Sequence, residues 1–165
     1  MALTKDELIA SLQNEVRILL HLADKADAAV LDYRPTPKQR STIELLRYLT
    51  YMGPVMIPSI QAGAFDMPAW SAAEQAAQAA NFEQVRASLA AQTDLYAQLL
   101  GDYSEEDFQT QIEMFGRTSS KGYLITNVVL CGHAAYRTQL FLYLKANGHD
   151  ELNTYNLWAG IDAQM

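Results

Sequence analysis

The stretch that decides the fold is Cys131–Gly148, with the sequence CGHAAYRTQLFLYLKANG. With the residues before it, this stretch predicts a helix over about 121–147, which Ser119 or Ser120 caps and Gly148 closes. One apolar face carries Leu124, Val128, Cys131, Ala135 and Leu142, and another carries Val129, His133, Tyr136, Leu140 and Tyr143. A helix that is apolar on two faces is typical of a central position. We expect one face to pack in the core and the other against a second copy of the chain, in a homodimer.

A first long helix is predicted near the N-terminus. Thr4 and Glu7 have the spacing of a capping box, in which a hydroxyl and a carboxylate satisfy free backbone amides. Apolar residues then recur every three or four positions over about 5–30, as on one face of a helix. The segment 32–37 contains two prolines, which lack the backbone amide, and it should end this helix.

Two more helices follow in the sequence. Helical periodicity resumes from about Gln39, where we expect Gly53-Pro54 to kink the helix and Pro58 to bend or close it. Asn81 is a favourable cap for the next helix, whose apolar residues continue to Gly101. These segments and the C-terminal helix make four helices in all.

The remaining segments are less periodic. Residues 62–80 predict a crossover in which Ser71–Glu74 caps a short helical turn, and residues 104–116 contain one amphipathic turn across the end of the bundle. The tail, 152–161, has no helical pattern but contains apolar residues that should pack down. No run alternates like a strand. We therefore predict an all-α, single-domain fold over 1–165, a four-helix bundle with a long crossover between helices two and three.

Composition excludes several classes of protein. The net charge is −7, and the twelve Lys and Arg residues form no cluster, which argues against binding to nucleic acid. No segment resembles a signal peptide or approaches the length of a membrane span, so we expect a soluble, cytoplasmic protein. The only cysteine, Cys131, cannot form an internal disulfide, and we expect it to be a small buried apolar residue.

Two motifs carry a resemblance to a known family. Helix two contains Glu44–Leu49 (ELLRYL), and the C-terminal helix contains an Arg-x-Gln-Leu motif at 137–140. The chain thereby resembles the DinB/YfiT-like superfamily, which carries Glu-Leu-Leu-x-His on helix two and His-x-x-(His)-His-Arg-Gly-Gln-Leu on helix four. This resemblance implies a DinB-like four-helix bundle. In that superfamily three histidines hold a divalent metal inside the bundle, and members resemble metal-dependent thiol transferases or hydrolases.

The resemblance also implies that the metal site has been lost. When the motifs are aligned without gaps, Tyr48, Gly132 and Tyr136 occupy the three positions at which the family has histidine. His133 is one position out of register and would point roughly 100° around the helix from Gly132. We therefore expect no metal and no cofactor at the usual place, and instead a cavity lined by tyrosine.

Four residues are candidates for lining a ligand pocket. Tyr48 and Tyr136 can present hydroxyls to a ligand, or can pair with each other in the core. His133 can act as an acid or base near neutral pH, although a packed or interface histidine is the simpler interpretation. Arg137 can clamp an anion, but a salt bridge to a carboxylate of helix one or two is favoured, with Glu44 as one candidate partner.

The sequence supports three functional hypotheses. The first is a protein that has lost the three-histidine site and binds a small molecule or a partner, with no assigned catalytic residue. The alternative is a DinB-like metal-dependent enzyme with a different ligand set, for example His21, His133 and a carboxylate, or one that uses His133, Tyr136 and Arg137 without a metal. The third is a purely structural module without a useful cavity. Common enzyme motifs, such as a phosphate-binding loop or a nucleophile elbow, are absent from the sequence.

Overall fold

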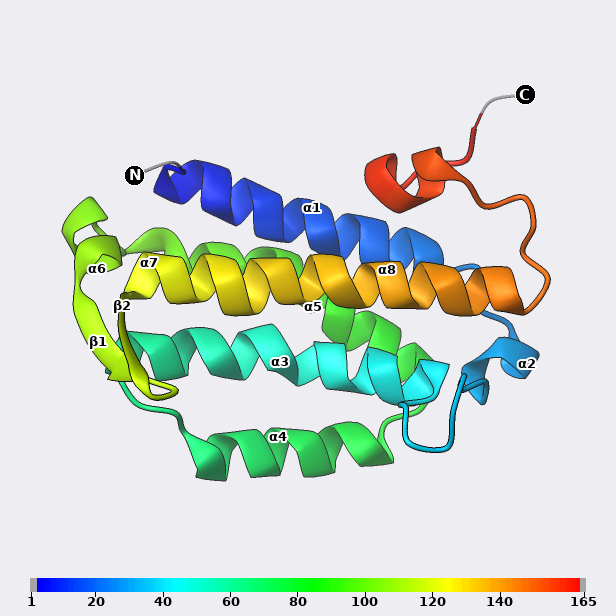
Figure 1. The fold of residues 1–165 in the computed structure, drawn as a ribbon, viewed down its shortest axis with the longest axis horizontal. Coiled ribbons are helices and arrows are strands. Elements are labelled where there is room, and N and C mark those ends of the chain that lie inside the picture. Colours follow the sequence, from blue (N-terminus) through cyan, green and yellow to red (C-terminus); the bar gives the residue numbers. More distant parts are fainter. Residues whose placement is uncertain (1–2, 164–165) are drawn as a thin grey trace.

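A computed structural model describes residues 3–163 of the chain (Figure 1). Within these residues, four long helices form the bundle: α1 (Lys5–Ala23), α3 (Thr42–Ala62), α5 (Phe82–Gly101) and a fourth composed of α7 (Lys121–Leu124), a π-helical segment (Ile125–Leu130) and α8 (Cys131–Ala146). Buried side chains from all four helices form a common hydrophobic core. The all-α bundle predicted from the sequence is confirmed, and no helix of residues 3–163 is long and apolar enough to cross a membrane.

Local capping signals fix where the long helices begin. Thr4 with Glu7 and Asn81 with Gln84 form the capping boxes expected for α1 and α5, and Ser120 caps α7. The prediction for the end of the first helix is wrong. The helix stops at Ala23, and Asp27 caps a separate turn, α2 (Ala28–Leu31), by accepting bonds from two backbone amides.

Helix α3 begins at Thr42 rather than Gln39, because Ser41 and Glu44 form another capping box. The prediction that Pro58 could close this helix is also wrong, since α3 continues through Pro54 and Pro58 to Ala62. It ends at Gly63, whose φ of +78° is readily adopted only by glycine. The helix is therefore long enough to pass Pro54 and still span the bundle.

A side chain from α5 compensates for Pro54. Proline has no amide to donate to the carbonyl of Thr50, four residues earlier. The Gln92 side chain fills this role, since its Nε2 donates to the carbonyl oxygens of Leu49 at 2.8 Å and Thr50 at 3.1 Å. Gly53 lets the neighbouring Tyr96 approach, because a Cβ there would overlap the Tyr96 hydroxyl.

The crossover between the second and third bundle helices is itself a helix. Instead of the short turn predicted to begin at Ser71, α4 (Met67–Ala79) starts five residues after α3 ends. Asp66 caps it by accepting a bond from the Ala69 amide, and Pro68 occupies the first turn, where a missing amide costs nothing. Helix α4 packs along the outer side of α3 (Figure 1).

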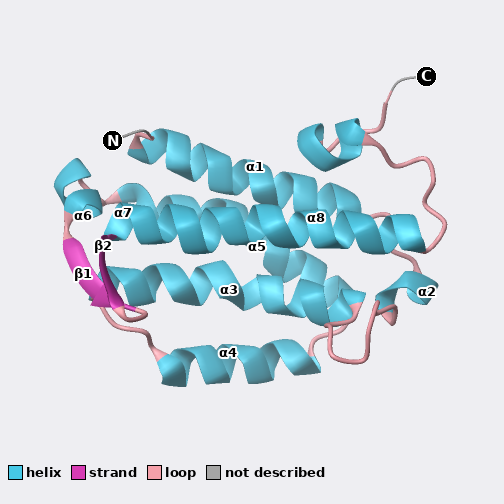
Figure 2. Cartoon of the chain, viewed as in Figure 1, coloured by secondary structure: helices cyan, strands magenta, loops and turns pink. Residues whose placement is uncertain are grey.

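A short helix and a β-hairpin cover one end of the bundle. Helix α6 (Glu105–Gln109) is followed by the antiparallel strands β1 (Gln111–Met114) and β2 (Arg117–Ser120) (Figure 2). Phe115 and Gly116 connect the strands, both with positive φ, as in a tight hairpin turn of type I′. The single amphipathic turn predicted for residues 104–116 does not account for this hairpin.

After α8, the chain folds back over α1 and α8 (Figure 1). Residues Tyr155–Ala159 form a π-helical turn, so the expectation of a tail without helical structure was wrong, but the expectation that it packs down is confirmed. Arg137 donates to the carbonyl oxygen of Leu157 at 2.6 Å, and the Asn156 amide lies 3.1 Å from Nε2 of His21. These contacts fix the tail to the bundle.

Candidate functional site

The structure brings Tyr48 of α3 and Tyr136 of α8 together. Their ring centroids lie 5.1 Å apart, with the planes at 67°, which is the edge-to-face geometry that aromatic rings favour. Burial and the neighbouring Tyr136 raise the pKa of Tyr48 far above the usual phenol range. The Tyr48 hydroxyl is therefore protonated at neutral pH and can act as a hydrogen-bond donor.

These residues do not fit the three-histidine metal centre of the DinB-like proteins. Gly132 has no side chain, and Met52 fills its surroundings, because a Cβ at Gly132 would lie 3.2 Å from the methyl carbon of Met52. The other two positions offer phenol side chains instead of imidazoles. Within residues 3–163 no three His, Cys, Asp or Glu side chains come together as a metal-binding group.

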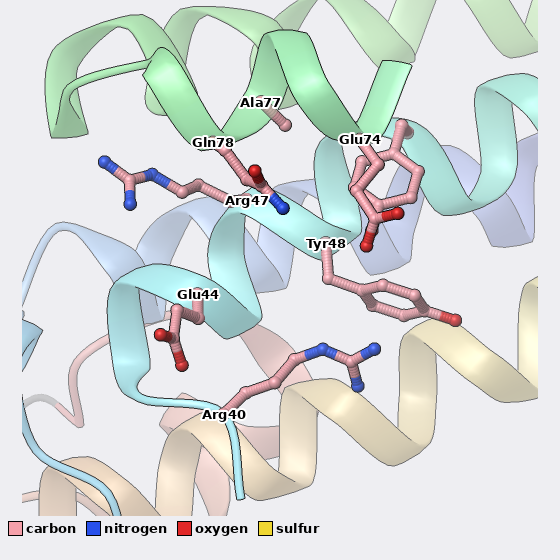
Figure 3. A pocket seen from close by; sticks show the side chains of 8 residues that line it. Arg40, Glu44, Arg47, Tyr48, Glu74, Ala77 and Gln78 are labelled. Carbon is pink, nitrogen blue, oxygen red and sulfur yellow. The ribbon is translucent and has the colours of Figure 1, made fainter. Parts of the chain in front are cut away.

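A pocket of about 280 Å³ lies beside Tyr48, between α3 and α4 (Figure 3). Its lining comes from one face of α3, from the facing side of α4 and from the loop before α3. The lining residues are Arg40, Glu44, Arg47, Tyr48, Tyr51, Glu74, Ala77 and Gln78. The α3 residues at positions 44, 47, 48 and 51 follow helical spacing, so the helix itself places them on one face.

Two arginines bring positive charge to this pocket. The guanidinium carbon of Arg40 lies 4.0 Å from the centroid of the Tyr48 ring, a cation–π contact that Figure 3 shows below the ring. Within residues 3–163 the Arg40 guanidinium makes no hydrogen bond or ion pair, and only the Arg40 backbone carbonyl is bonded, by the Tyr143 hydroxyl. Arg47 donates from Nε at 3.0 Å and from Nη2 at 2.6 Å to the carbonyl oxygen of Ala80. Neither guanidinium has a carboxylate partner among the described residues.

The two acidic residues of the pocket have partners of their own. Glu44 accepts bonds from the Ser41 amide at 2.8 Å and from Arg34 at 3.0 Å, which together keep the pKa of its carboxyl low despite an opposing effect of burial. Glu74 accepts a bond from the Tyr51 hydroxyl at 3.3 Å. Burial and the Glu74 carboxylate raise the pKa of Tyr51, so its hydroxyl is a donor at neutral pH.

Aromatic rings form a continuous wall behind the pocket. Tyr51 lies 5.5 Å from Tyr48 and 5.0 Å from Trp70 between ring centroids, both with edge-to-face geometry. Trp70 also contacts Tyr48 at 6.0 Å and Phe65 at 5.4 Å. This packing holds the rings of Tyr48 and Tyr51 in fixed orientations.

His133 lies away from this pocket, in the core. Its Nε2 is 2.6 Å from the Tyr96 hydroxyl, which donates to the Gln92 side chain at 2.9 Å, while Nδ1 has no partner among the described residues. Burial lowers the pKa of His133 to about 4, so the imidazole is neutral at neutral pH. The packed histidine favoured as the simpler interpretation is what the structure contains.

Arg137 is also buried, on the side of α8 that faces α1. Its Nε lies 3.0 Å from the Glu15 carboxylate, and the ring of Trp158 covers its guanidinium at 5.4 Å. The predicted salt bridge to a carboxylate of helix one is therefore present. The suggestion of Glu44 as its partner was wrong, because Glu44 pairs with Arg34.

The other sequence candidates are dispersed. His21 contacts Asn156 and Asp162 near the C-terminal turn, whereas His133 contacts Tyr96, so the two histidines have different surroundings. The prediction of a buried Cys131 was wrong. This residue lies on the exposed face of α8, four residues before the equally exposed Ala135.

Four residues that line the pocket were not predicted from the sequence: Arg40, Arg47, Tyr51 and Glu74. For part of this set a signal exists, since Glu44, Arg47 and Tyr51 follow helical spacing on the same face as Tyr48. Arg40 precedes the helix and Glu74 belongs to α4. Only the tertiary structure brings these two residues to the α3 face.

Comparisons with known proteins agree with this architecture. No protein-family model and no curated protein matches the sequence. Among solved structures, the chain is similar to a DinB-like protein, YjoA, from Bacillus subtilis, with 19% sequence identity and a TM-score of 0.69. The similarity covers 90% of this chain and 96% of that chain. At this level of identity the similarity concerns the fold, and it shows that this chain has the DinB-like bundle architecture.

Proposed function

We propose that this protein binds a small molecule in the pocket between α3 and α4. The observation that carries the proposal is a positively charged side chain without a counter-ion, Arg40, which stacks on the Tyr48 ring in the pocket lining. Convergent polar groups beside an aromatic wall are typical of ligand sites. In the pocket, the N–H groups of the Arg40 guanidinium are available to a ligand, whereas the core side chains of Gln92, Tyr96 and His133 bond to one another.

The proposal includes loss of the metal chemistry found in DinB-like relatives. It is supported by the side chains at the three expected positions, Tyr48, Gly132 and Tyr136, which do not fit an imidazole-ligated ion. Elemental analysis of protein purified without a histidine tag tests this point. Stoichiometric zinc, nickel or iron would overturn it.

Ligand-induced thermal stabilisation across a metabolite panel tests binding, because a ligand that binds only the folded state raises the melting temperature. Gln78→Trp places a large ring at the pocket from an exposed position, and should abolish the stabilisation by any true ligand. Gln75→Trp, on the exposed surface of the same helix but outside the pocket lining, is the matched control and should leave it intact. The proposal would be contradicted if no metabolite stabilised the protein, or if Gln78→Trp left the stabilisation by every ligand unchanged.

We also propose that two copies pair through the exposed face of the fourth bundle helix, which α7, the π-helical segment and α8 form together. Six exposed residues follow one another at helical spacing on this face, and none is charged: Tyr123, Asn127, Cys131, Ala135, Thr138 and Leu142. Because each copy has a net charge of −7, two copies repel each other least where the surface is uncharged. We further propose that the protein is cytoplasmic, because the exposed thiol of Cys131 suits a reducing compartment.

Sedimentation analysis tests this pairing. Leu142→Asp should convert dimers to monomers, because it would bury a charge in the interface. Met67→Asp, at a residue on α4 that is as exposed as Leu142 (58% each), is the control and should leave the dimer unchanged. A monomeric wild-type protein at high concentration would rule out the interface.

A further inference from the structure

The chemistry of the pocket narrows the class of ligand, and this inference rests on the binding function proposed above. The Arg40 guanidinium lies over the face of the Tyr48 ring. A guanidinium in this position can donate N–H bonds from its edges while its flat face remains on the ring. A carboxylate matches this donor edge with two parallel hydrogen bonds. The site for the anionic group is therefore beside the Tyr48 ring.

The partners of the acidic residues favour an anion over a cation. Arg34 and the Ser41 amide already neutralise and bind Glu44, while Glu74 accepts a bond from Tyr51. The two pocket arginines lack any carboxylate partner within residues 3–163. Arg34, which neutralises Glu44, lies outside the pocket lining. The charges of the two pocket arginines therefore exceed the remaining charge of the Glu74 carboxylate, and the charge that the pocket lacks is negative.

The hydrogen bonds of Arg47 fix its place in the pocket. Nε and Nη2 both donate to the Ala80 carbonyl at the end of α4, which holds the side chain across the gap between α3 and α4. Its positive charge is thereby kept on the pocket wall. Arg47 thus adds to the positive potential without needing to contact the ligand.

The size and wall of the pocket suit a single aromatic ring. A volume of about 280 Å³ is at the lower end of ordinary ligand sites, so the ligand is small. The rings of Tyr48 and Tyr51 line the pocket, and Trp70 supports both from behind. Aromatic rings attract other rings in edge-to-face or offset packing.

We propose that the ligand is a small aromatic carboxylate, whose carboxylate pairs with Arg40 and whose ring packs against Tyr48 and Tyr51. Arg40 is the residue that determines specificity for the anion. The two tyrosines select the ring.

Four probes of similar or smaller size separate charge from shape: benzoate, benzamide, benzylamine and acetate. Binding is followed through the fluorescence of Trp70 in a Trp158→Phe background, in which Trp70 is the only remaining tryptophan. We expect benzoate to bind at least about tenfold more tightly than the other three probes, since a charge-assisted hydrogen bond has about this effect on affinity. Calorimetry provides a second measurement that does not depend on the reporter.

Arginine variants test the role of Arg40. Arg40→Ala should weaken benzoate binding by about tenfold or more, and Arg40→Lys should restore part of it, because lysine keeps the charge but loses the planar donor edge. Arg117→Ala is the matched control, since Arg117 also lies over a tyrosine ring, that of Tyr123 at 5.1 Å, outside the pocket lining. It should leave benzoate binding unchanged.

The outcomes distinguish this inference from the underlying function. If benzamide or benzylamine binds as tightly as benzoate and Gln78→Trp blocks it, the pocket binds ligands but the anion specificity is wrong. If acetate equals benzoate, the aromatic requirement is wrong. If no probe binds but a panel metabolite does, and Gln78→Trp abolishes the binding of that metabolite, then the proposed ligand class is wrong and the binding function stands. If neither probes nor metabolites bind, both proposals fail.

Discussion

Two clusters of polar and aromatic side chains contact α3, and they differ in how their hydrogen-bonding groups are used. In the core cluster, His133, Tyr96 and Gln92 bond to one another and to the α3 backbone. In the pocket cluster, the Arg40 guanidinium stacks on Tyr48 and has no hydrogen-bond partner among the described residues. The first arrangement stabilises the helix around Pro54. The pocket cluster leaves the N–H donors of Arg40 available. The two clusters therefore show how side chains that stabilise the fold differ from side chains that can bind a ligand.

Among the substitutions that test this contrast, Gly53→Ala is expected to cause the largest loss of stability. A Cβ at this position would overlap the Tyr96 hydroxyl, so Tyr96 must move and its bonds to Gln92 and His133 must break. We expect the free energy of unfolding to fall by about 3–5 kcal/mol, measured by urea denaturation. Gly101→Ala is the control, because that glycine has open space around it, and it should change stability by less than about 1 kcal/mol. Equal effects of the two substitutions would refute the tight core contact.

Acid should weaken the core cluster through His133. Its pKa in the folded protein is about 4, below the 6.5 of a free histidine, so the unfolded chain takes up the proton first as pH falls. The free energy of unfolding should therefore decrease between about pH 6.5 and pH 4, by about 3 kcal/mol from this group. His133→Gln keeps a donor for Tyr96 but does not titrate, and denaturation curves across this range should show a flatter pH dependence for it. An unchanged slope would contradict the burial of a neutral imidazole.

A double-mutant cycle at Gln92 and Pro54 should show a smaller effect. Gln92→Leu removes the donor for the carbonyls of Leu49 and Thr50 and should cost about 2 kcal/mol of stability. In a Pro54→Ala background the backbone amide of residue 54 can bond Thr50 again, so the same substitution should cost less. Additive effects of the two substitutions would mean that Gln92 does not compensate for the proline.

The smallest effect on stability is expected in the pocket. Arg40→Ala removes an exposed cation–π contact and should change the free energy of unfolding by less than about 1 kcal/mol, measured by the same denaturation method. Loss of several kcal/mol would place Arg40 with the residues that serve the fold, and would remove the contrast between the two clusters.

The features that could be predicted from the sequence are mainly local. Capping boxes at Thr4 and Asn81 act within four residues, and both were recognised. Asp66 and Pro68 carry a comparable signal for the start of α4, but it was overlooked in favour of Ser71. The hairpin gave only a faint signal, because its strands are four residues long and only Gly116 marks the turn.

The candidate site was predictable only in part. The resemblance of two helix motifs assigned Tyr48 and Tyr136 to two of the family's ligand positions, with pairing in the core as one alternative, and the rings are in contact. Arg40 reaches Tyr48 from a loop and Glu74 comes from the crossover helix, so their positions depend on packing between elements far apart in sequence. The exposure of Cys131 was missed because helical periodicity shows which residues share a face, without showing which face meets the core.

The π-helical segment Ile125–Leu130 has a consequence for the numbering of homologous positions. A π-helical turn accommodates about one residue more than an α-helical turn, so such a segment is equivalent to a one-residue insertion within a continuous helix. A relative with an uninterrupted α-helix here would match Lys121–Leu124 and Cys131–Ala146 only if its alignment contained a single gap between them. An ungapped alignment anchored at Ser120 would shift every position of α8 by one. A position of the relative that corresponds to His133 would then be matched to Gly132.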